Sequence, residues 1–546
     1  MPHLTEEEGT TQVGAFACSL VALVLAGTGA GTKYMETVVQ DDAQFLHRSP
    51  AAVNSSARRL AELGATRLRL TAGWSALAPN PTSRKVPPAP FDSSDSKTYP
   101  RGAFTTLDTA VKAATGNGVD VMIDLAFWAP RWAVGQAAPN PKRERYFVDA
   151  AAFGDFATAV ARRYSGAFPD PANPAKDLPA VRMYTTWNEP NHPSFLKPQW
   201  VRTPDGGFRP ESPHVYRAMH NAGYDAVKRV SRLNKVLVGG TASGGSTVPG
   251  KGGVPPLQFV RAMACVDDRL KPLNVPECAN YAPVKADGYS HHPYSRLVTP
   301  ATSDPYGDNA PIADSGRLAD LLDTLHERGR LANRLNIFNT EYGYESRQDD
   351  PFQPFERDQQ AAFIGWSTFL AWRDPDTSMM AQFLLRDIDP AESGNKRGTR
   401  KYYRDWQTGL YDKRGDAKPA ATGFKLPFWA QLQEIGLGTK VVLLFGQVRP
   451  GKGARTAHVE RQDPASGVWS PIVTGGPSCL DPTKPEFLTN PAGFFLRTAK
   501  ADGAARYRMV WHHEDDPGTE ASVPIDVAAN LGDPSPVGIT RPGQRK

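Results

Sequence analysis

The sequence of 546 residues predicts an α/β fold, a (β/α)8 TIM barrel followed by a small C-terminal β-sandwich domain. Two observations lead to this prediction. Strand-like apolar runs alternate with segments of helical periodicity over residues 33–436, which is typical of a barrel with insertions. From about residue 439 to 530, short strand-like runs are instead separated by turn residues, which favours a sandwich.

The expected barrel strands are short runs rich in apolar and β-branched residues that end at Gly, Pro or polar residues. The second of them places Arg67 and Arg69 in alternation, so both arginines should share one face of the strand. We expect the eight strands at residues 33–40, 65–70, 119–126, 181–187, 236–240, 284–290, 337–341 and 379–385.

The expected helices lie between these strands and repeat apolar residues at spacings of three and four. Ser49-Pro50 is typical of a helix start, with serine as N-cap and proline at the first helical position, and Gly64 ends that helix. The other helices are expected around Leu107 to Ala114, then at 148–164, from Ser212-Pro213 to about 230, at 256–264, 318–325, 358–372 and 420–432.

The two ends of the chain differ from the domains. Ala15 to Ala26 is an apolar run followed by small residues, so we expect residues 1–32 to hold a signal segment and the protein to be secreted or at the cell surface. The run is too short to span a membrane. Glu6 to Glu8 precede this run, whereas a signal peptide begins with basic residues. The alternatives are therefore that the start codon is misassigned or that the run is a strand. Residues 531–546 have little to bury and are expected to be a disordered tail.

Composition excludes some partners. The formal net charge is +6, but Lys and Arg are spread along the chain without a block of like charges, so we expect no nucleic-acid binding. Cys265 and Cys278 are close enough in sequence to form a disulfide that closes a loop, and the alternative is two free thiols. Cys479 is expected to be a buried or unpaired thiol.

Two glutamates carry the expected chemistry. Glu189 ends the fourth expected strand and Glu341 ends the seventh, so both should lie at the carboxyl-end mouth of the barrel. Retaining glycoside hydrolysis needs such a pair, one carboxyl that protonates the leaving oxygen and one carboxylate that attacks the anomeric carbon. Asn188 could bind a sugar hydroxyl, and Arg69 and Tyr294 could keep the nucleophile ionised.

Other groups near the strand ends are candidate ligands for a metal ion or a sugar. His291 and His292 are neighbours on a strand and point to opposite faces, so we expect no metal site, and no cofactor is expected. Tryptophans near loop ends can stack on sugar rings, and Trp128 and Trp187 are the expected contacts in the site. The other candidates are Trp74, Trp132, Trp200 and Trp406.

Residues 187–191, Trp-Asn-Glu-Pro-Asn, together with 340–343, Thr-Glu-Tyr-Gly, resemble clan A glycoside hydrolases, and families 39 and 5 are the nearest. The resemblance covers residues 33–435. It implies a cellulase-like barrel glycosidase in which Glu189 is the acid/base and Glu341 the nucleophile. It also implies supporting roles for the strand-2 arginine and the strand-6 His-x-Tyr pair, which are here Arg69, His292 and Tyr294.

The chain departs from the family 5 pattern at two places. Phe127-Trp128 stands where a strand-3 histidine is usual, and Gln382, Phe383 and Arg386 stand near the usual strand-8 tryptophan. We therefore expect a retaining hydrolase of a polysaccharide or oligosaccharide, monomeric, with its sugar undetermined. The alternative is an inactive barrel that binds glycan.

The C-terminal domain has two interpretations. Trp469 and Trp511 could form a platform of a carbohydrate-binding module, or the domain could simply pack against the barrel.

Overall fold

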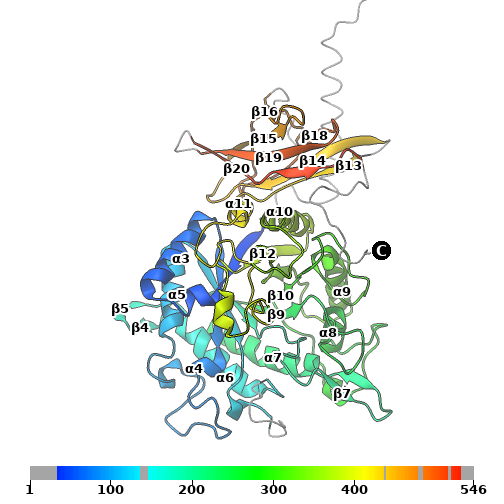
Figure 1. Cartoon of the computed structure of the whole chain (residues 1–546). Helices are drawn as coiled ribbons and strands as arrows, with labels where there is room; N and C mark the ends of the chain where they lie inside the picture. The colour runs from blue at the N-terminus through cyan, green and yellow to red at the C-terminus, as the bar shows by residue number, and fades with distance from the viewer. Residues whose placement is uncertain (1–33, 136–144, 436–437, 477–483, 514–517, 531–546) are drawn as a thin grey trace, which may run out of the picture.

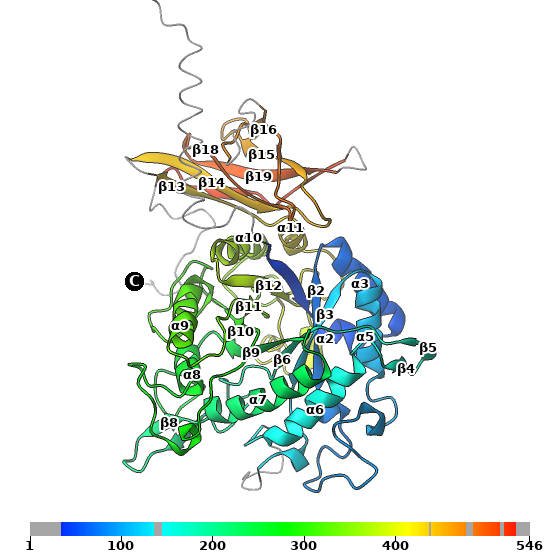
Figure 2. The ribbon, with the colours of Figure 1, turned by 180° about the vertical axis from the view of Figure 1, so that it is seen from behind.

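The computed structural model describes residues 34–135, 145–435, 438–476, 484–513 and 518–530. The expected signal segment, the expected tail, Cys18 and Cys479 lie outside these ranges. Figure 1 shows a barrel with a β-sandwich beside it, and Figure 2 shows the same arrangement from behind. The predicted fold class is therefore confirmed.

Eight parallel strands close the barrel, and each is followed by a helix. The first strand pairs with the last, with Gln40 opposite Phe383. The strands, in the order of the chain, are β1 (Glu36–Gln40), β2 (Arg67–Gly73), β3 (Asp120–Ala126), β6 (Met183–Thr186), β9 (Lys235–Ala242), β10 (Gly288–His292), β11 (Ile337–Asn339) and β12 (Thr377–Phe383).

The helices that follow them cover the outside of the barrel. Ser49 Oγ accepts from the Ala52 N–H at the start of the first long helix, as its sequence predicted. These helices are α3 (Pro50–Glu62), α5 (Thr105–Gly116), α6 (Ala150–Arg163), α7 (Ser212–Val230), α8 (Pro256–Met263), α9 (Ser315–Glu327), α10 (Arg357–Arg373) and α11 (Pro419–Lys425).

Shorter elements decorate the loops. The short helices are α2 (Asp42–Phe45), α4 (Trp74–Leu77), η2 (Ser96–Thr98), η3 (Arg131–Ala133), η4 (Pro276–Cys278), η5 (Ile312–Asp314) and η6 (Pro390–Ser393). Two hairpins pair β4 (Pro169–Asp170) with β5 (Asn173–Asp177) and β7 (Trp200–Arg202) with β8 (Phe208–Pro210).

The lumen of the barrel is filled by side chains rather than open. A small apolar cluster holds one or two inward residues from most strands, among them Met122, Met183 and Phe338. Gly288 leaves room for the Phe338 ring, because a Cβ there would lie 2.4 Å from the Phe338 Cε2 atom. These packed side chains fill the lumen, so ligands can reach only the ends of the strands.

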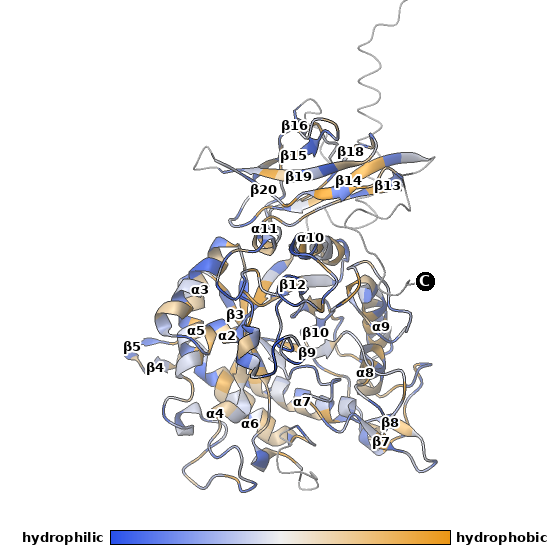
Figure 3. Cartoon of the chain, viewed as in Figure 1, coloured by the Kyte–Doolittle hydropathy of each residue, from blue (hydrophilic) through white to orange (hydrophobic). Residues whose placement is uncertain are grey.

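The sandwich consists of two antiparallel sheets. One has the order β13 (Phe428–Ile435), β14 (Thr439–Gln447), β18 (Phe494–Lys500). The other has the order β16 (Trp469–Ile472), β15 (Thr456–Gln462), β19 (Ala505–His512), β20 (Thr519–Ala521), with β17 (Phe487–Leu488) on β15 and β21 (Ile525–Val527) on β19. Hydrophobic segments are visible on β14 and β19 in Figure 3.

One boundary differs from the prediction. Residues 428–432 were expected in the last barrel helix, but they form β13 and pair with β14. Pro427 is the physical reason, because proline has no N–H to continue the helix and drives the preceding residue toward extended backbone. The sandwich therefore begins at residue 428 rather than at 439.

A second hydrophobic cluster, separate from the main core of the barrel, joins the barrel to the sandwich. Helix α10 is buried on almost every face, since the barrel covers one side and the sandwich covers the other. The Trp366 and Trp429 rings stack with centroids 4.2 Å apart, and Trp372 lies 5.1 Å from Phe445. This contact agrees with a packing role for the C-terminal domain.

The proposed platform of Trp469 and Trp511 is not formed. Trp469 pairs with Gln462, which pairs with Arg506, whereas Trp511 is five residues beyond Arg506 and points to the opposite face of the sheet. Trp511 is also only 8% exposed, with the Lys425 Nζ 5.7 Å from its ring. The two indoles therefore cannot stack on one glycan together.

Candidate active site

The predicted catalytic glutamates meet at the carboxyl ends of the strands. Glu189 follows β6, the fourth strand of the barrel, and Glu341 follows β11, the seventh. An oxygen of each glutamate and one ring nitrogen of His292 all lie within 4.8 Å of one another. The pair therefore faces one common space, with His292 between its members.

The backbone around Glu189 is a tight turn. Trp187 and Glu189 have positive φ angles of 78° and 38°, a region that non-glycine residues seldom occupy. The Glu189 N–H donates to the Gly240 carbonyl over 2.9 Å. Gly240 has a φ of 65°, and a Cβ there would lie 3.2 Å from the Trp187 carbonyl oxygen. The glycine on β9 thus allows the close approach that fixes the Glu189 backbone.

Both oxygens of Glu341 receive a hydrogen bond. Arg69 donates from Nη1 to Oε2 over 2.9 Å, and the Tyr294 hydroxyl donates to Oε1 over 3.0 Å. Burial, followed by the charge of Glu341, raises the pKa of Tyr294 well above its usual value, so this hydroxyl keeps its proton. Two charge-assisted donors of this kind stabilise and orient a carboxylate.

Arg69 connects the residues of the site. Its buried guanidinium also donates from Nη2 to Asp124 Oδ2 over 2.9 Å and to Asn188 Oδ1 over 3.0 Å, and from Nη1 to Gln40. Burial lowers the pKa of Arg69, but the charges of Asp124 and Glu341 outweigh it and raise the pKa. The arginine therefore remains a cation and holds four different strands or loops at fixed distances.

Glu189 has a different environment. Burial raises its pKa, and electrostatic interactions with His192, Arg296 and Arg69 oppose that rise. Its Oε1 lies 3.1 Å from His292 Nδ1. Burial lowers the pKa of His292 to about 3, so this imidazole is neutral near neutral pH. The raised pKa of Glu189 favours its protonated form, and Glu341 beside it is held by Arg69. This is the division of roles that an acid and a nucleophile need.

The tryptophan predictions have mixed outcomes. Trp187 is fully buried, packs on Phe153 and donates from Nε1 to the Phe195 carbonyl, so it is a core residue and cannot stack on a sugar. Trp74 is likewise fully buried. Trp128 is 37% exposed and donates to the Ser194 carbonyl, so its ring remains accessible at the mouth.

Trp406 lies against Tyr294 at the active site, a position that could not be predicted from its place in a long loop. Its ring stacks on Tyr294 with centroids 5.4 Å apart and meets Phe383 edge-on at 6.0 Å. It comes from the long loop after β12, so an aromatic ring lies beside the strand-8 position where the sequence lacked one. Arg386, expected near the substrate, instead donates its guanidinium to the Lys413 carbonyl.

Asp124 and Gln40 were missed as parts of the site. Asp124 was detectable, since it is a charged residue inside the apolar run Val-Met-Ile-Asp-Leu-Ala at 121–126. A buried carboxylate requires a cationic or hydrogen-bonding partner, and here the partner is Arg69. Gln40 offered no such signal, because a glutamine at the end of a strand is ordinary.

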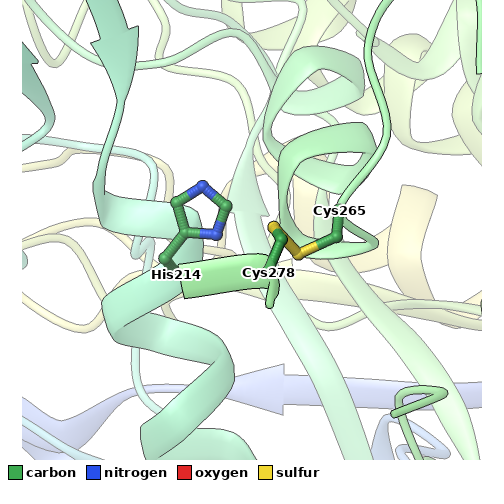
Figure 4. A group of neighbouring side chains, drawn as sticks. All are labelled: His214, Cys265 and Cys278. Atoms are coloured by element: carbon green, nitrogen blue, oxygen red, sulfur yellow. A yellow bond between two sulfur atoms is a disulfide. The ribbon is translucent and has the colours of Figure 1, made fainter. Parts of the chain in front are cut away.

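A second group of potential metal ligands lies outside the barrel mouth. Figure 4 shows His214 beside Cys265 and Cys278, whose sulfur atoms are bonded to each other. Disulfide sulfurs are not the thiolates that bind metals. The predicted pairing of these cysteines is therefore present, and it closes the loop between α8 and η4. At the mouth, a metal ion on Glu189, His292 and Glu341 would meet the charge of Arg69, which is unfavourable.

Comparisons with known proteins agree with this geometry. The model of the cellulase family, glycosyl hydrolase family 5, matches residues 26–371. A search of curated proteins finds no match. Among the described residues, no helix is both long and apolar enough to cross a membrane.

Similar solved structures include a GH5_18 from Bifidobacterium longum subsp. infantis, at 19% identity and a TM-score of 0.44, with 72% of this chain and 78% of that chain covered. They also include the endo-beta-1,4-mannanase from Thermotoga petrophila, at 12% identity and a TM-score of 0.41, with 92% of this chain and 99% of that chain covered.

The family model covers more than half of the sequence and contains both strand-end glutamates. The chain therefore belongs to glycoside hydrolase family 5, and it is a glycoside hydrolase with a carbohydrate substrate.

Proposed function

We propose that the protein is a retaining glycoside hydrolase that cleaves O-glycosidic bonds of a polysaccharide or oligosaccharide by double displacement. The observation that carries this proposal is the short separation of the carboxyl oxygens of Glu189 and Glu341, which lie within 4.8 Å of each other. Retaining enzymes hold the two carboxyl groups about 5–5.5 Å apart, whereas inverting enzymes leave about 6.5–9.5 Å for a water molecule.

The first step is the attack of a Glu341 oxygen on the anomeric carbon. The bond from that carbon to the leaving oxygen breaks, and Glu189 gives its proton to the leaving oxygen. The raised pKa of Glu189 supports this role, because it keeps a larger fraction of the carboxyl protonated. Arg69 and Tyr294 hold Glu341 in its orientation throughout.

The second step releases the sugar. Glu189, now ionised, takes a proton from a water molecule, and the water oxygen attacks the anomeric carbon and displaces Glu341. Two inversions at one carbon retain the configuration of the substrate. No cofactor takes part in either step.

The test is a pair of variants, Glu341→Ala and Glu189→Ala, measured on a panel of aryl glycosides. Both should lose activity by several orders of magnitude on substrates with poor leaving groups. Azide should restore turnover in both, giving a glycosyl azide of inverted configuration from the first variant and of retained configuration from the second. Wild-type activity in either variant would refute the assignment.

The alternative of an inactive barrel that binds glycan would require binding without turnover by the wild-type protein, and membership of glycoside hydrolase family 5 argues against it. The hydrogen-bonded pair of Glu341 with Arg69 and Tyr294 favours an active site instead. Calorimetric titration with soluble polysaccharides, followed by analysis of products, distinguishes the two.

We further propose that the protein acts as a monomer outside the cytoplasm. The disulfide between Cys265 and Cys278 supports an oxidising compartment. Fractionation of producing cells tests the location, and sedimentation tests the oligomeric state.

A further inference from the structure

A cavity of about 590 Å³ lies beside the catalytic glutamates. Its walls are the loops after β9 and β10, together with His192 from the loop after β6, and we call it the loop pocket. Tyr294 lines it and donates to Glu341, while His192 stands three residues after Glu189. The loop pocket is therefore continuous with the site of reaction.

The position of the loop pocket identifies the part of the substrate that it can hold. An acid that protonates the leaving oxygen must lie on the side of the leaving group. The loop pocket is on the side of Glu189, because His192 lines it and the His192 N–H donates to the Glu189 carbonyl over 2.8 Å. Its lining is mainly Gly, Ser, Thr and Pro, and its aromatic rings are those of Tyr294 and His192.

The ionisable side chains of this lining differ in how many hydrogen bonds they make with the protein. Asp304 accepts from the Tyr306 N–H over 2.8 Å and from Asn309 Nδ2 over 3.1 Å. Burial lowers the pKa of His192, and its Nδ1 accepts from the Ser194 N–H over 3.2 Å, so the neutral ring presents an Nε2–H donor. Arg296 makes no hydrogen bond or ion pair with any residue that the structure describes. Among the described residues, the Arg296 guanidinium is thus the charged group of the loop pocket whose hydrogen-bond donors are not engaged by the protein.

Arg296 is held on a fixed turn rather than on a loose loop. Its φ is 56°, and the flanking backbone is bound on both sides. Ser243 Oγ donates to the Tyr294 carbonyl, and the Tyr344 hydroxyl donates to the Val298 carbonyl, both over 2.8 Å. A guanidinium presented from such a turn loses little entropy when it binds a carboxylate through two parallel hydrogen bonds.

We infer that the loop pocket binds the leaving-group sugar and that Arg296 selects leaving groups bearing a carboxylate, such as a uronic acid unit. This inference rests on the proposed function, since a leaving group exists only if the glycosidic bond is cleaved. The sugar that is transferred to Glu341 is recognised elsewhere and can be neutral.

The test uses two aryl glycosides of one sugar that the wild-type enzyme hydrolyses. One carries a 4-carboxyphenyl leaving group, and the other carries its uncharged methyl ester. The ratio of kcat/KM for the acid to kcat/KM for the ester is measured in the wild type, Arg296→Gln and Arg296→Lys. Comparing ratios between variants cancels the different intrinsic reactivity of the two phenols. Arg58→Gln, which alters an exposed arginine on the outer helix α3, is the matched control.

Arg296→Gln should lower this ratio by about threefold to fivefold at low ionic strength, which is the size expected of a solvent-accessible ion pair. Added salt should reduce the wild-type ratio toward that of the variant. Arg296→Lys should retain part of the preference, and Arg58→Gln all of it. Hydrolysis of both substrates with the same ratio in the wild type and Arg296→Gln would overturn the inference alone. Failure of the wild type to hydrolyse any glycoside of the panel would refute the proposed function, and the inference with it.

Discussion

Removing the hydroxyl of Tyr294 isolates one hydrogen bond of the site. In Tyr294→Phe the ring can still stack on Tyr342 and Trp406, whose centroids lie 6.0 Å and 5.4 Å away. What is lost is the 3.0 Å hydrogen bond to Glu341 Oε1. A hydrogen bond to a charged group contributes about 1.5–3 kcal/mol. At about 1.4 kcal/mol per factor of ten, kcat should fall by about 10-fold to 150-fold.

A neighbouring tyrosine provides the control. Tyr342 is also buried, but its hydroxyl lies 2.7 Å from Ser367 Oγ and is directed away from the catalytic carboxylates. Tyr342→Phe should therefore lower stability slightly and leave kcat within about twofold of the wild type. The assay is steady-state hydrolysis of an aryl glycoside, with thermal unfolding of each variant measured alongside. Equal kcat values in the wild type and Tyr294→Phe would refute the role given to this hydrogen bond.

Three further variants test other parts of the structure. Glu189→Gln should raise the unfolding midpoint in urea at pH 7, and this gain should vanish below about pH 4. The reason is that burial raises the folded-state pKa of Glu189, so its ionisation costs stability as pH rises. Urea titrations at several pH values measure the gain, and an equal gain at all pH values would contradict the prediction. Trp372→Ala should lose about 3–5 kcal/mol in urea unfolding, since it empties the fully buried contact with Phe445; a loss below 1 kcal/mol would mean that barrel and sandwich are independent. Replacing Cys265 and Cys278 by serine should cost about 3 kcal/mol, because it opens a loop of 13 residues, and adding a reductant to the wild type should reproduce the lower midpoint.

The sequence predicted the barrel well because its signals are local and repeated. Each strand is a short apolar run, α3 begins at the Ser49-Pro50 cap, and the two glutamates follow strands four and seven. The contact between Arg69 and Glu341 could also be predicted from their positions on the second and seventh strands, because parallel strands bring their carboxyl ends to one face of the barrel.

Other parts of the site depended on information that spacing does not contain. Trp187 was expected to contact the substrate because it lies next to a strand end, but its positive φ breaks the alternation of the strand and turns the indole into the core. Trp406 comes from a loop whose path the sequence does not determine. Trp429 was expected within the last barrel helix, but Pro427 ends that helix and residue 429 pairs with Phe445 in the sandwich.

The order in which the chain is synthesised has a consequence for this architecture. Strand β1 can pair with β2 early, but its other edge stays open until β12 has been made, since Gln40 pairs with Phe383 on that edge. Helix α10 then still exposes the surface that β14 and β18 will cover, until residue 500 has left the ribosome. A nascent chain of this protein therefore carries an open sheet edge and an uncovered aromatic surface through most of translation. Both features favour aggregation, so the yield of soluble protein should depend on chaperones and should fall sharply when the last 120 or so residues are removed.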